Sequence, residues 1–235
     1  MLGDFLEFSV SVPSLAEAAN ELQSLGFQEA ITTEIADSPY MPLSMSSATI
    51  GLRPNNEDAL AISFVRPDLI NYLRAYRRIG IKPQFASLAD DEFHRAGFED
   101  PNGPQIVLLE ARTCTPLHPD NVIVSILGDF VEFCAPTHSL AESTEFWGQL
   151  GLHQDAERKS TEGSTHLHGH GLRIGFYEGV RFAPGLSFTC ADLDTRVAFL
   201  EAKGCSIRRQ LPFDTPTRAG ATIAGNVPIY LLAGA

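Results

Sequence analysis

Apolar positions in the first segment change from a strand-like run to a helical spacing. Residues 5–12 form an apolar run typical of a strand, and Pro13-Ser14 supply a helix start. Gly26 ends the helix, and strand-like pieces continue to Arg53. The apolar stripe of the helix consists of Leu15, Ala18, Ala19, Leu22 and Leu25.

The second segment follows the same order. Residues 59–65 form an apolar strand, Pro67-Asp68 begin a helix and Gly80 ends it. The turn signal Asp100-Pro101-Asn102-Gly103 then precedes a buried strand at 106–109. The apolar stripe of this helix consists of Leu69, Leu73, Tyr76 and Ile79.

Both segments return in the second half of the chain. The stretch from Gly3 to Phe8 reappears from Gly128 to Phe133, and the two copies are 125 residues apart. The fourth segment copies the second, and its helix carries Val197, Phe199 and Leu200. Such a repeat predicts four modules, each with a strand, a helix and about three more strands.

The repeat also predicts the domain boundaries. We expect one domain at 1–112, with modules at 1–56 and 57–112, and a second at 126–235, with modules at 126–181 and 182–235. Residues 113–125 contain prolines and no apolar periodicity, so we interpret them as a linker.

Composition excludes several classes of function. The 235 residues carry a net charge of −12 and a pI near 4.9, which argues against binding nucleic acid through its phosphates. No run approaches the roughly 18 apolar residues that span a bilayer. We expect no signal peptide, because the first residues lack a basic region followed by a long apolar run. We therefore expect a cytoplasmic protein, monomeric or homodimeric, with reduced cysteines.

Two features of the modules resemble the vicinal oxygen chelate superfamily, which includes glyoxalase I, extradiol dioxygenases and bleomycin-resistance proteins. These are the stretch from Asp100 to Leu108 and the strand-to-helix entries at Val12-Pro13 and Arg66-Pro67-Asp68. The resemblance implies an α+β fold of four βαβββ modules, paired into two glyoxalase-like domains. It also implies a cupped mixed sheet in each domain, with the ligand lying in the cup.

The resemblance further implies a divalent metal, held by a His on the first strand and a Glu on the last strand of a module. The first-strand positions fall on Glu7 and Glu132, and near Ala61 and Gly185. The last-strand positions of the second and fourth modules fall on Val107 and Tyr230; the first and third modules offer Gly51 or Leu52, and Gly175 or Tyr177. Each half keeps at most one oxygen ligand, so no cofactor is favoured, although a divalent metal stays open.

Glu7 and Glu132 are the first candidate functional residues, because each is a carboxylate within an apolar strand. Alternation along the strand puts each on the cup face, where we expect partial desolvation. Each is either a general base or ligand anchor, or a structural partner of a nearby arginine.

A histidine cluster is found only in the second half. His166 and His168 share one face of a predicted strand, and imidazole suits zinc, iron, nickel or copper. The sequence from His168 to Gly171 also indicates a hairpin turn, which puts His170 outside the strand. The cluster is either an exposed hairpin or a metal site shared with Glu132.

Aromatic residues complete the predicted cups. Phe5, Phe130, Tyr177 and Tyr230 are expected to contact a ligand, whereas Trp147 is expected to pack in the core. The leading hypothesis is a small-molecule-binding protein of the glyoxalase or bleomycin-resistance type without the usual metal. The alternative is a metal-dependent lyase, isomerase or dioxygenase that uses Glu132 with His166 or His168.

Overall fold

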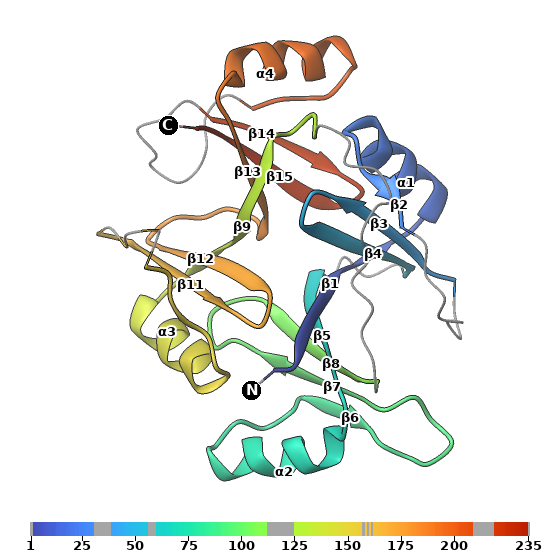
Figure 1. The fold of residues 1–235 in the computed structure, drawn as a ribbon, viewed down its shortest axis with the longest axis vertical. Helices are drawn as coiled ribbons and strands as arrows, with labels where there is room; N and C mark the ends of the chain where they lie inside the picture. The colour runs from blue at the N-terminus through green and yellow to red at the C-terminus, as the bar shows by residue number, and fades with distance from the viewer. Residues whose placement is uncertain are drawn as a thin grey trace. The chain divides into compact units, whose positions relative to one another are not determined.

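The computed structural model describes residues 2–30, 39–55, 60–111, 125–156, 158, 160, 162–208 and 219–234 (Figure 1). Most of the predicted linker at 113–125 lies outside these residues. The first half contains β1 (Asp4–Val12), α1 (Leu15–Ser24), β2 (Gln28–Glu29), β3 (Met41–Met45), β4 (Ala48–Pro54), β5 (Leu60–Arg66), α2 (Leu69–Arg78), β6 (Phe85–Ser87), β7 (Arg95–Glu99) and β8 (Gln105–Glu110).

The second half repeats this order. It contains β9 (Asp129–Thr137), α3 (Leu140–Gln149), β10 (His153–Gln154), β11 (Ser164–Gly169), β12 (Leu172–Glu178), β13 (Gly185–Cys190), α4 (Leu193–Ala202), β14 (Ala219–Ala224) and β15 (Val227–Ala233). The predicted order of a strand, a helix and three strands is confirmed in three modules, and the described part of the fourth has two strands after its helix.

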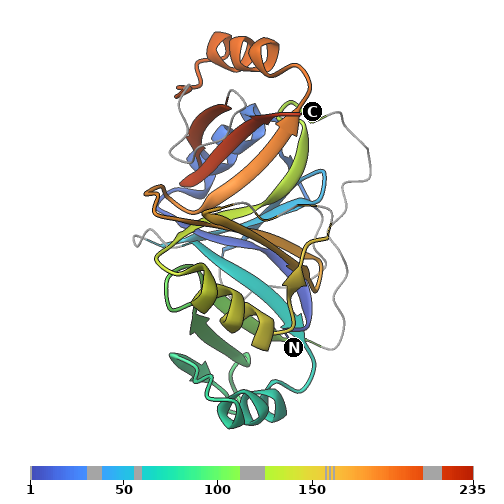
Figure 2. The ribbon, with the colours of Figure 1, turned by 90° about the vertical axis from the view of Figure 1, so that its left-hand side faces the viewer.

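Hydrogen bonding joins these strands into two mixed sheets, one for each half of the sequence. The strand order is β2-β3-β4-β1-β5-β8-β7-β6 in the first sheet and β10-β11-β12-β9-β13-β15-β14 in the second. Strands β1 and β4, β5 and β8, and β13 and β15 pair in parallel. The expected α+β architecture with mixed sheets is therefore confirmed (Figure 2).

The chain also divides into two compact units that differ from the sequence halves. The first unit contains residues 1–7, 61–116 and 135–179, so it combines the second module with the third. The second unit contains residues 8–60, 117–134 and 180–235, and so combines the first module with the fourth. The boundaries at 1–112 and 126–235 therefore describe the sheets, and as folding domains they stay a prediction.

Serine caps explain why α1 and α3 begin where they do. Ser14 and Ser139 have extended backbones, and their side chains accept hydrogen bonds from the amides of Glu17 and Glu142. These bonds satisfy amides that have no partner within the helix. Equivalent caps at the same repeat position show that duplication preserved the start of both helices.

Two apolar positions of the predicted helical stripes are exposed. Helix α2 ends at Arg78, so Ile79 lies at its C-cap and is 50% exposed. Phe199 lies on α4, as expected, and is 45% exposed. Trp147 is fully buried, as predicted, and packs against Phe176.

Aromatic packing forms the core of the second unit. Phe8 stacks on Phe133 with ring centroids 5.4 Å apart, and Phe27 meets Phe188 edge-on. All four of these side chains are at most 2% exposed. The core of the second unit therefore combines rings from its first and fourth modules with Phe133 of strand β9.

A buried acid joins the two modules of the first unit. Asp100, in the turn between β7 and β8, accepts hydrogen bonds from Trp147 Nε1 at 2.7 Å and Ser143 Oγ at 3.2 Å, both on α3. The amide of Asn102 donates to the same carboxyl group at 2.7 Å. Burial raises the pKa of Asp100, while these three donors oppose the shift.

The second unit has a corresponding contact between a helix and a turn, but here the acid lies on the helix and the donor lies in the turn. Glu21, on α1, accepts a hydrogen bond of 2.7 Å from the amide of Gly225, in the turn between β14 and β15. Gly225 has a positive φ of 54°, and a Cβ there would lie 2.9 Å from Leu22 Cδ1. Glycine is therefore required for the turn to approach the helix this closely.

The histidine hairpin forms as a tight turn. Gly169 pairs with Leu172, which leaves His170 and Gly171 as the loop, both with positive φ. This geometry matches a two-residue hairpin and confirms that His170 lies outside the strand. None of the described helices has the length and apolar character needed to cross a membrane.

Candidate functional site

Three polar side chains lie side by side across the second sheet. The backbone register pairs Ser187 of β13 with Glu132 of β9 on one side and with Tyr230 of β15 on the other. Paired residues on neighbouring strands project to the same face, so these side chains form one row. We call Glu132, Ser187 and Tyr230 the polar row.

A bulge in β9 separates the polar row from the aromatic core. Ser187 pairs with Glu132 but Phe188 pairs with Phe130, so one extra residue of β9 lies between the pairs. Phe130 consequently faces the same side as Phe188, and their ring centroids are 5.6 Å apart. Regular alternation along the strand predicts that Phe130 and Glu132 share one face of the sheet. Because of the bulge, the two side chains lie on opposite faces.

The polar row is held by bonds to the backbone. Ser187 Oγ donates to the carbonyl of Glu132 at 3.1 Å. The Tyr230 hydroxyl donates to the carbonyl of Ala183 at 2.7 Å, and Phe182 meets the tyrosine ring edge-on. Gly185 lies beneath this ring, because a Cβ there would come within 2.9 Å of Tyr230 Cε2.

Burial controls the chemistry of the row. Glu132 and Ser187 are each 1% exposed, and Tyr230 is 5% exposed. Desolvation raises the pKa of Tyr230 far above its ordinary value, so its phenol stays protonated and acts as a donor. The row therefore offers one carboxylate acceptor, a serine hydroxyl and a neutral phenol.

The first sheet has a related set of residues with fewer polar side chains. Glu7 is fully buried and Ser63 is 1% exposed, and Val107 is the register partner of Ser63. Phe5 meets Phe64 edge-on at 6.0 Å, as Phe130 meets Phe188. Duplication thus kept the Glu and Ser positions, whereas the tyrosine belongs to the second half alone.

Comparison with solved structures finds proteins that share the fold of this chain. A catechol 2,3-dioxygenase matches 100% of this chain and 88% of its own length, with a TM-score of 0.62 and 17% identity. The 2,3-dioxygenase LapB from Pseudomonas sp. KL28 matches 100% of this chain and 94% of its own length, with a TM-score of 0.65 and 15% identity.

A homoprotocatechuate 2,3-dioxygenase from Brevibacterium fuscum matches 98% of this chain and 81% of its own length, with a TM-score of 0.65 and 17% identity. The chain has the fold of the vicinal oxygen chelate superfamily. No protein-family model and no curated protein sequence matches the chain. The evidence for the fold therefore comes from structure.

Glu132 and Tyr230 of the polar row stand at positions that the vicinal oxygen chelate resemblance assigns to metal ligands, and Ser187 lies two residues from a third such position, Gly185. The residues of the row do not suit a metal, because they supply one carboxylate and no imidazole. Tyr230 already donates to Ala183, and Glu7, Ser63 and Val107 supply no better set. Throughout the described residues, no group of three His, Cys, Asp or Glu side chains is arranged to hold a metal ion.

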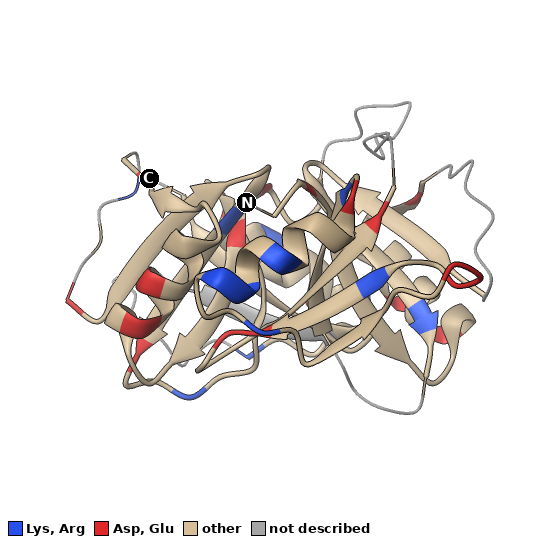
Figure 3. Cartoon of the chain, turned by 90° about the horizontal axis from the view of Figure 1, so that it is seen from below, with Lys and Arg blue, Asp and Glu red and all other residues tan. Residues whose placement is uncertain are grey.

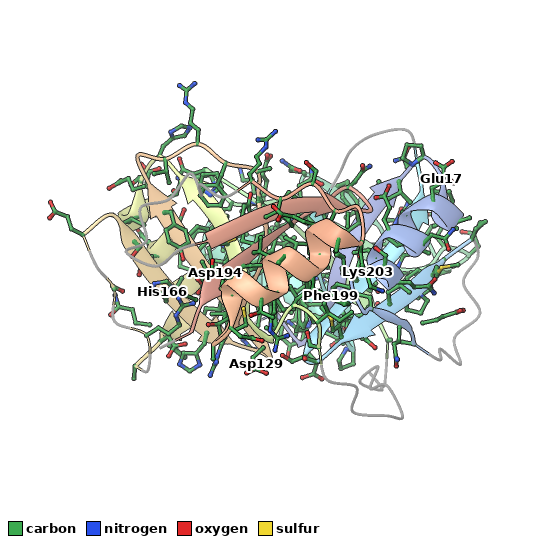
Figure 4. The ribbon with its side chains drawn as sticks, turned by 90° about the horizontal axis from the view of Figure 1, so that it is seen from above. Glu17, Asp129, His166, Asp194, Phe199 and Lys203 are labelled. Atoms are coloured by element: carbon green, nitrogen blue, oxygen red, sulfur yellow. The ribbon has the colours of Figure 1, made fainter. Side chains whose placement is uncertain are left out.

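The two candidate metal-binding histidines differ in environment. His166, which is labelled in Figure 4, is 6% exposed. Its ring meets that of Tyr177 edge-on, with ring centroids 6.0 Å apart. His168 is exposed and pairs through the backbone with Arg173 and His153. The structure therefore joins His166 with Tyr177, whereas His168 lies at the exposed end of the hairpin.

Two residues of the site were missed at the level of sequence. The resemblance points to the neighbourhood of Gly185 on the fourth module's first strand, whereas the residue that pairs with both Glu132 and Tyr230 is Ser187. The signal was present, because Ser63 and Ser187 occupy equivalent positions in the second and fourth modules. Phe182 lies before β13, outside any helix or strand, so no periodic pattern of apolar residues includes it.

Proposed function

We propose that this protein binds a small aromatic molecule at the polar row, without a metal. The observation that supports this most directly is the row itself: Glu132, Ser187 and Tyr230 replace a metal-binding set with hydrogen-bonding groups. The fold supplies the precedent for a ligand on this face of the sheet. The net charge of −12 favours a neutral or cationic ligand over an anion.

The aromatic pair beside the row suggests the kind of ligand. Phe182 and Tyr230 present ring edges and faces, to which a flat ring adds by stacking. Glu132 accepts a hydroxyl or ammonium hydrogen from the ligand, since a carboxylate takes up to about four hydrogen bonds. One similar structure, a homoprotocatechuate 2,3-dioxygenase, was solved in complex with 3,4-dihydroxyphenylacetate. Because we expect a neutral or cationic ligand, uncharged catechol, which has the same ring with two hydroxyl groups, is the first probe.

Binding at the row requires a local movement. Because the row is buried, a ligand can reach it only if a neighbouring segment moves. We propose that this is the segment with Phe182 and Ala183, since it contacts Tyr230. The hydrogen bond from Tyr230 to Ala183 holds this segment in place. We expect Tyr230→Phe to bind the ligand faster, because it removes that bond and keeps the ring.

Binding of a panel of catechols and aryl amines tests the proposal. Calorimetry measures the affinity of each compound, and stopped-flow fluorescence measures its rate of binding. We expect Glu132→Gln to weaken binding about tenfold, through loss of a charge-assisted hydrogen bond. Glu7→Gln, at the matching repeat position, is the control and should leave the affinity unchanged. Equal effects of the two substitutions would exclude the polar row, as would stoichiometric zinc, iron, nickel or manganese in purified protein.

One observation favours a second candidate, a metal-dependent lyase, isomerase or dioxygenase. His166 is a buried imidazole beside Tyr177 on the second sheet, and His168 lies two positions along the same strand. Elemental analysis of wild type and His166→Ala decides between the candidates. Bound metal that disappears in the variant supports the enzyme, and metal-free wild type excludes it.

A further inference from the structure

A hollow of about 410 Å³ opens in the first unit, whereas the polar row belongs to the second unit. It lies between α3, the turn after β7 and the segment that follows α2. Its apolar lining consists of Ile79, Ile81, Phe98, Pro101 and Phe146. Volumes of this size are typical of sites for small organic ligands.

Carboxylates surround this apolar floor. Glu99, Glu142 and Glu145 line the hollow, and Lys82 is the one basic residue among the lining side chains. Figure 3 shows the acidic residues of α3 in red and the arginines of α2 in blue. The local charge therefore favours a cation, even though the neighbouring helix is basic.

Amide side chains position each of the three carboxylates. Asn102 Nδ2 donates to Glu142 at 3.2 Å, Gln149 Nε2 donates to Glu145 at 3.4 Å, and Gln84 donates to Glu99. An amide donor orients a carboxylate without neutralising it, so its charge still acts on a ligand. Each carboxylate also keeps capacity for a further donor.

The second unit lacks this combination at the equivalent positions. Phe146 corresponds to Glu21, which is bonded to the Gly225 amide, and Glu145 corresponds to Asn20. Ile79 and Ile81 correspond to Lys203 and Cys205. The apolar floor with an acidic rim is thus a property of one unit, so it is not a consequence of the repeat.

We propose that this hollow binds a small organic cation, an ammonium group attached to an aromatic or branched apolar body. The apolar body lies on Ile79, Ile81 and Phe146, and the ammonium group lies among the three carboxylates. The half-buried Phe146 ring adds an attraction for the cation through its face. This site is independent of the polar row and of the function proposed for it.

NMR titration of the whole protein with 2-phenylethylammonium tests the proposal. We expect saturable shifts at the amides of Ile81, Glu99 and Phe146, and weaker binding as salt is raised. The uncharged 2-phenylethanol and the anionic 3-phenylpropionate should bind at least fivefold more weakly. Equal binding of the alcohol, or no saturable shift in the hollow, would overturn the proposal.

Matched substitutions locate the site. Glu145→Gln and Phe146→Ala should each weaken binding of the cation about threefold to tenfold, because they remove a charge and part of the floor. Glu17→Gln on α1 is the control, since it removes a helix carboxylate at the repeat position of Glu142 in the other unit (Figure 4). An unchanged affinity in both α3 variants contradicts the proposal, and native-like spectra confirm that the variants are folded.

Discussion

In both compact units an acidic side chain joins a helix to a turn, but the acid lies in the turn of one unit and on the helix of the other. In the first unit, the turn supplies the acid: Asp100 reaches into α3 and accepts from Trp147 and Ser143. In the second, the helix supplies the acid, and Glu21 accepts from the backbone amide of Gly225. The repeat places a helix against a turn in both units, but the residues that make the contact differ.

Burial explains the different consequences of the two joints. Asp100 is 1% exposed, whereas Glu21 is exposed. A buried acid must have its hydrogen bonds satisfied, so the Asp100 joint is costly to disturb. An exposed acid can exchange its partner for water, so the Glu21 joint depends more on the close approach of Gly225 to Leu22.

The largest expected effect is in the first unit. Trp147→Phe removes the indole donor and leaves Asp100 buried with two donors, so we expect a loss of about 2 kcal/mol in the free energy of unfolding. Urea denaturation measures this loss. A double-mutant cycle with Asp100→Asn should show strong coupling, and additive effects of the two substitutions would show that the joint adds little.

In the second unit, the backbone of the turn should matter more than the acid. We expect Gly225→Ala to cost about 1–2 kcal/mol, because the new Cβ meets Leu22 and the positive φ disfavours alanine. Gly103→Ala, in the first unit's turn, is the control. Its nearest neighbour would be Asp100 Oδ1 at 3.6 Å, so thermal unfolding should be nearly unchanged.

Removing the charge of the exposed acid should have a smaller effect. Glu21→Gln keeps an acceptor for the Gly225 amide but loses the charge that strengthens the bond, so we expect a cost of about 0.5 kcal/mol. Chemical denaturation at low and high salt measures it. A loss as large as that of Trp147→Phe would contradict the contrast between the joints.

The smallest effect is a dependence of stability on pH. Burial raises the folded-state pKa of Asp100 above its unfolded value, so the folded state binds the proton more tightly. The resulting stabilisation is complete below the unfolded pKa and is lost as pH rises through the folded pKa. Asp100→Asn should remove this component from unfolding curves measured from about pH 4, the ordinary pKa of Asp, upward, whereas Glu21→Gln should retain it.

The sequence predicted the modules well because their signals are local. Helix caps at Ser14 and Ser139, turn residues at Asp100–Gly103 and the repeat itself need only nearby residues. The order of strands and helices and the buried Trp147 followed from these signals. The exposure of Ile79 and Phe199 could not be predicted in this way, because periodicity does not show where a helix ends or which of its faces is covered.

The candidate site was predicted only in part. Glu132 and Tyr230 were identified by position, but their neighbour Ser187 depends on register across two strands. The bulge that turns Phe130 away is likewise invisible in a pattern of alternation, because one extra residue reverses the face of all that follow it. Long-range pairing thus set the limit of the prediction.

The division of the modules bears on what one half of the chain could form. Each compact unit takes one module from each sequence half, and strands β1 and β9 contribute residues to both units. A lone half would therefore contain neither unit complete. A protein made of one half could build such units only by combining its modules with those of a second copy.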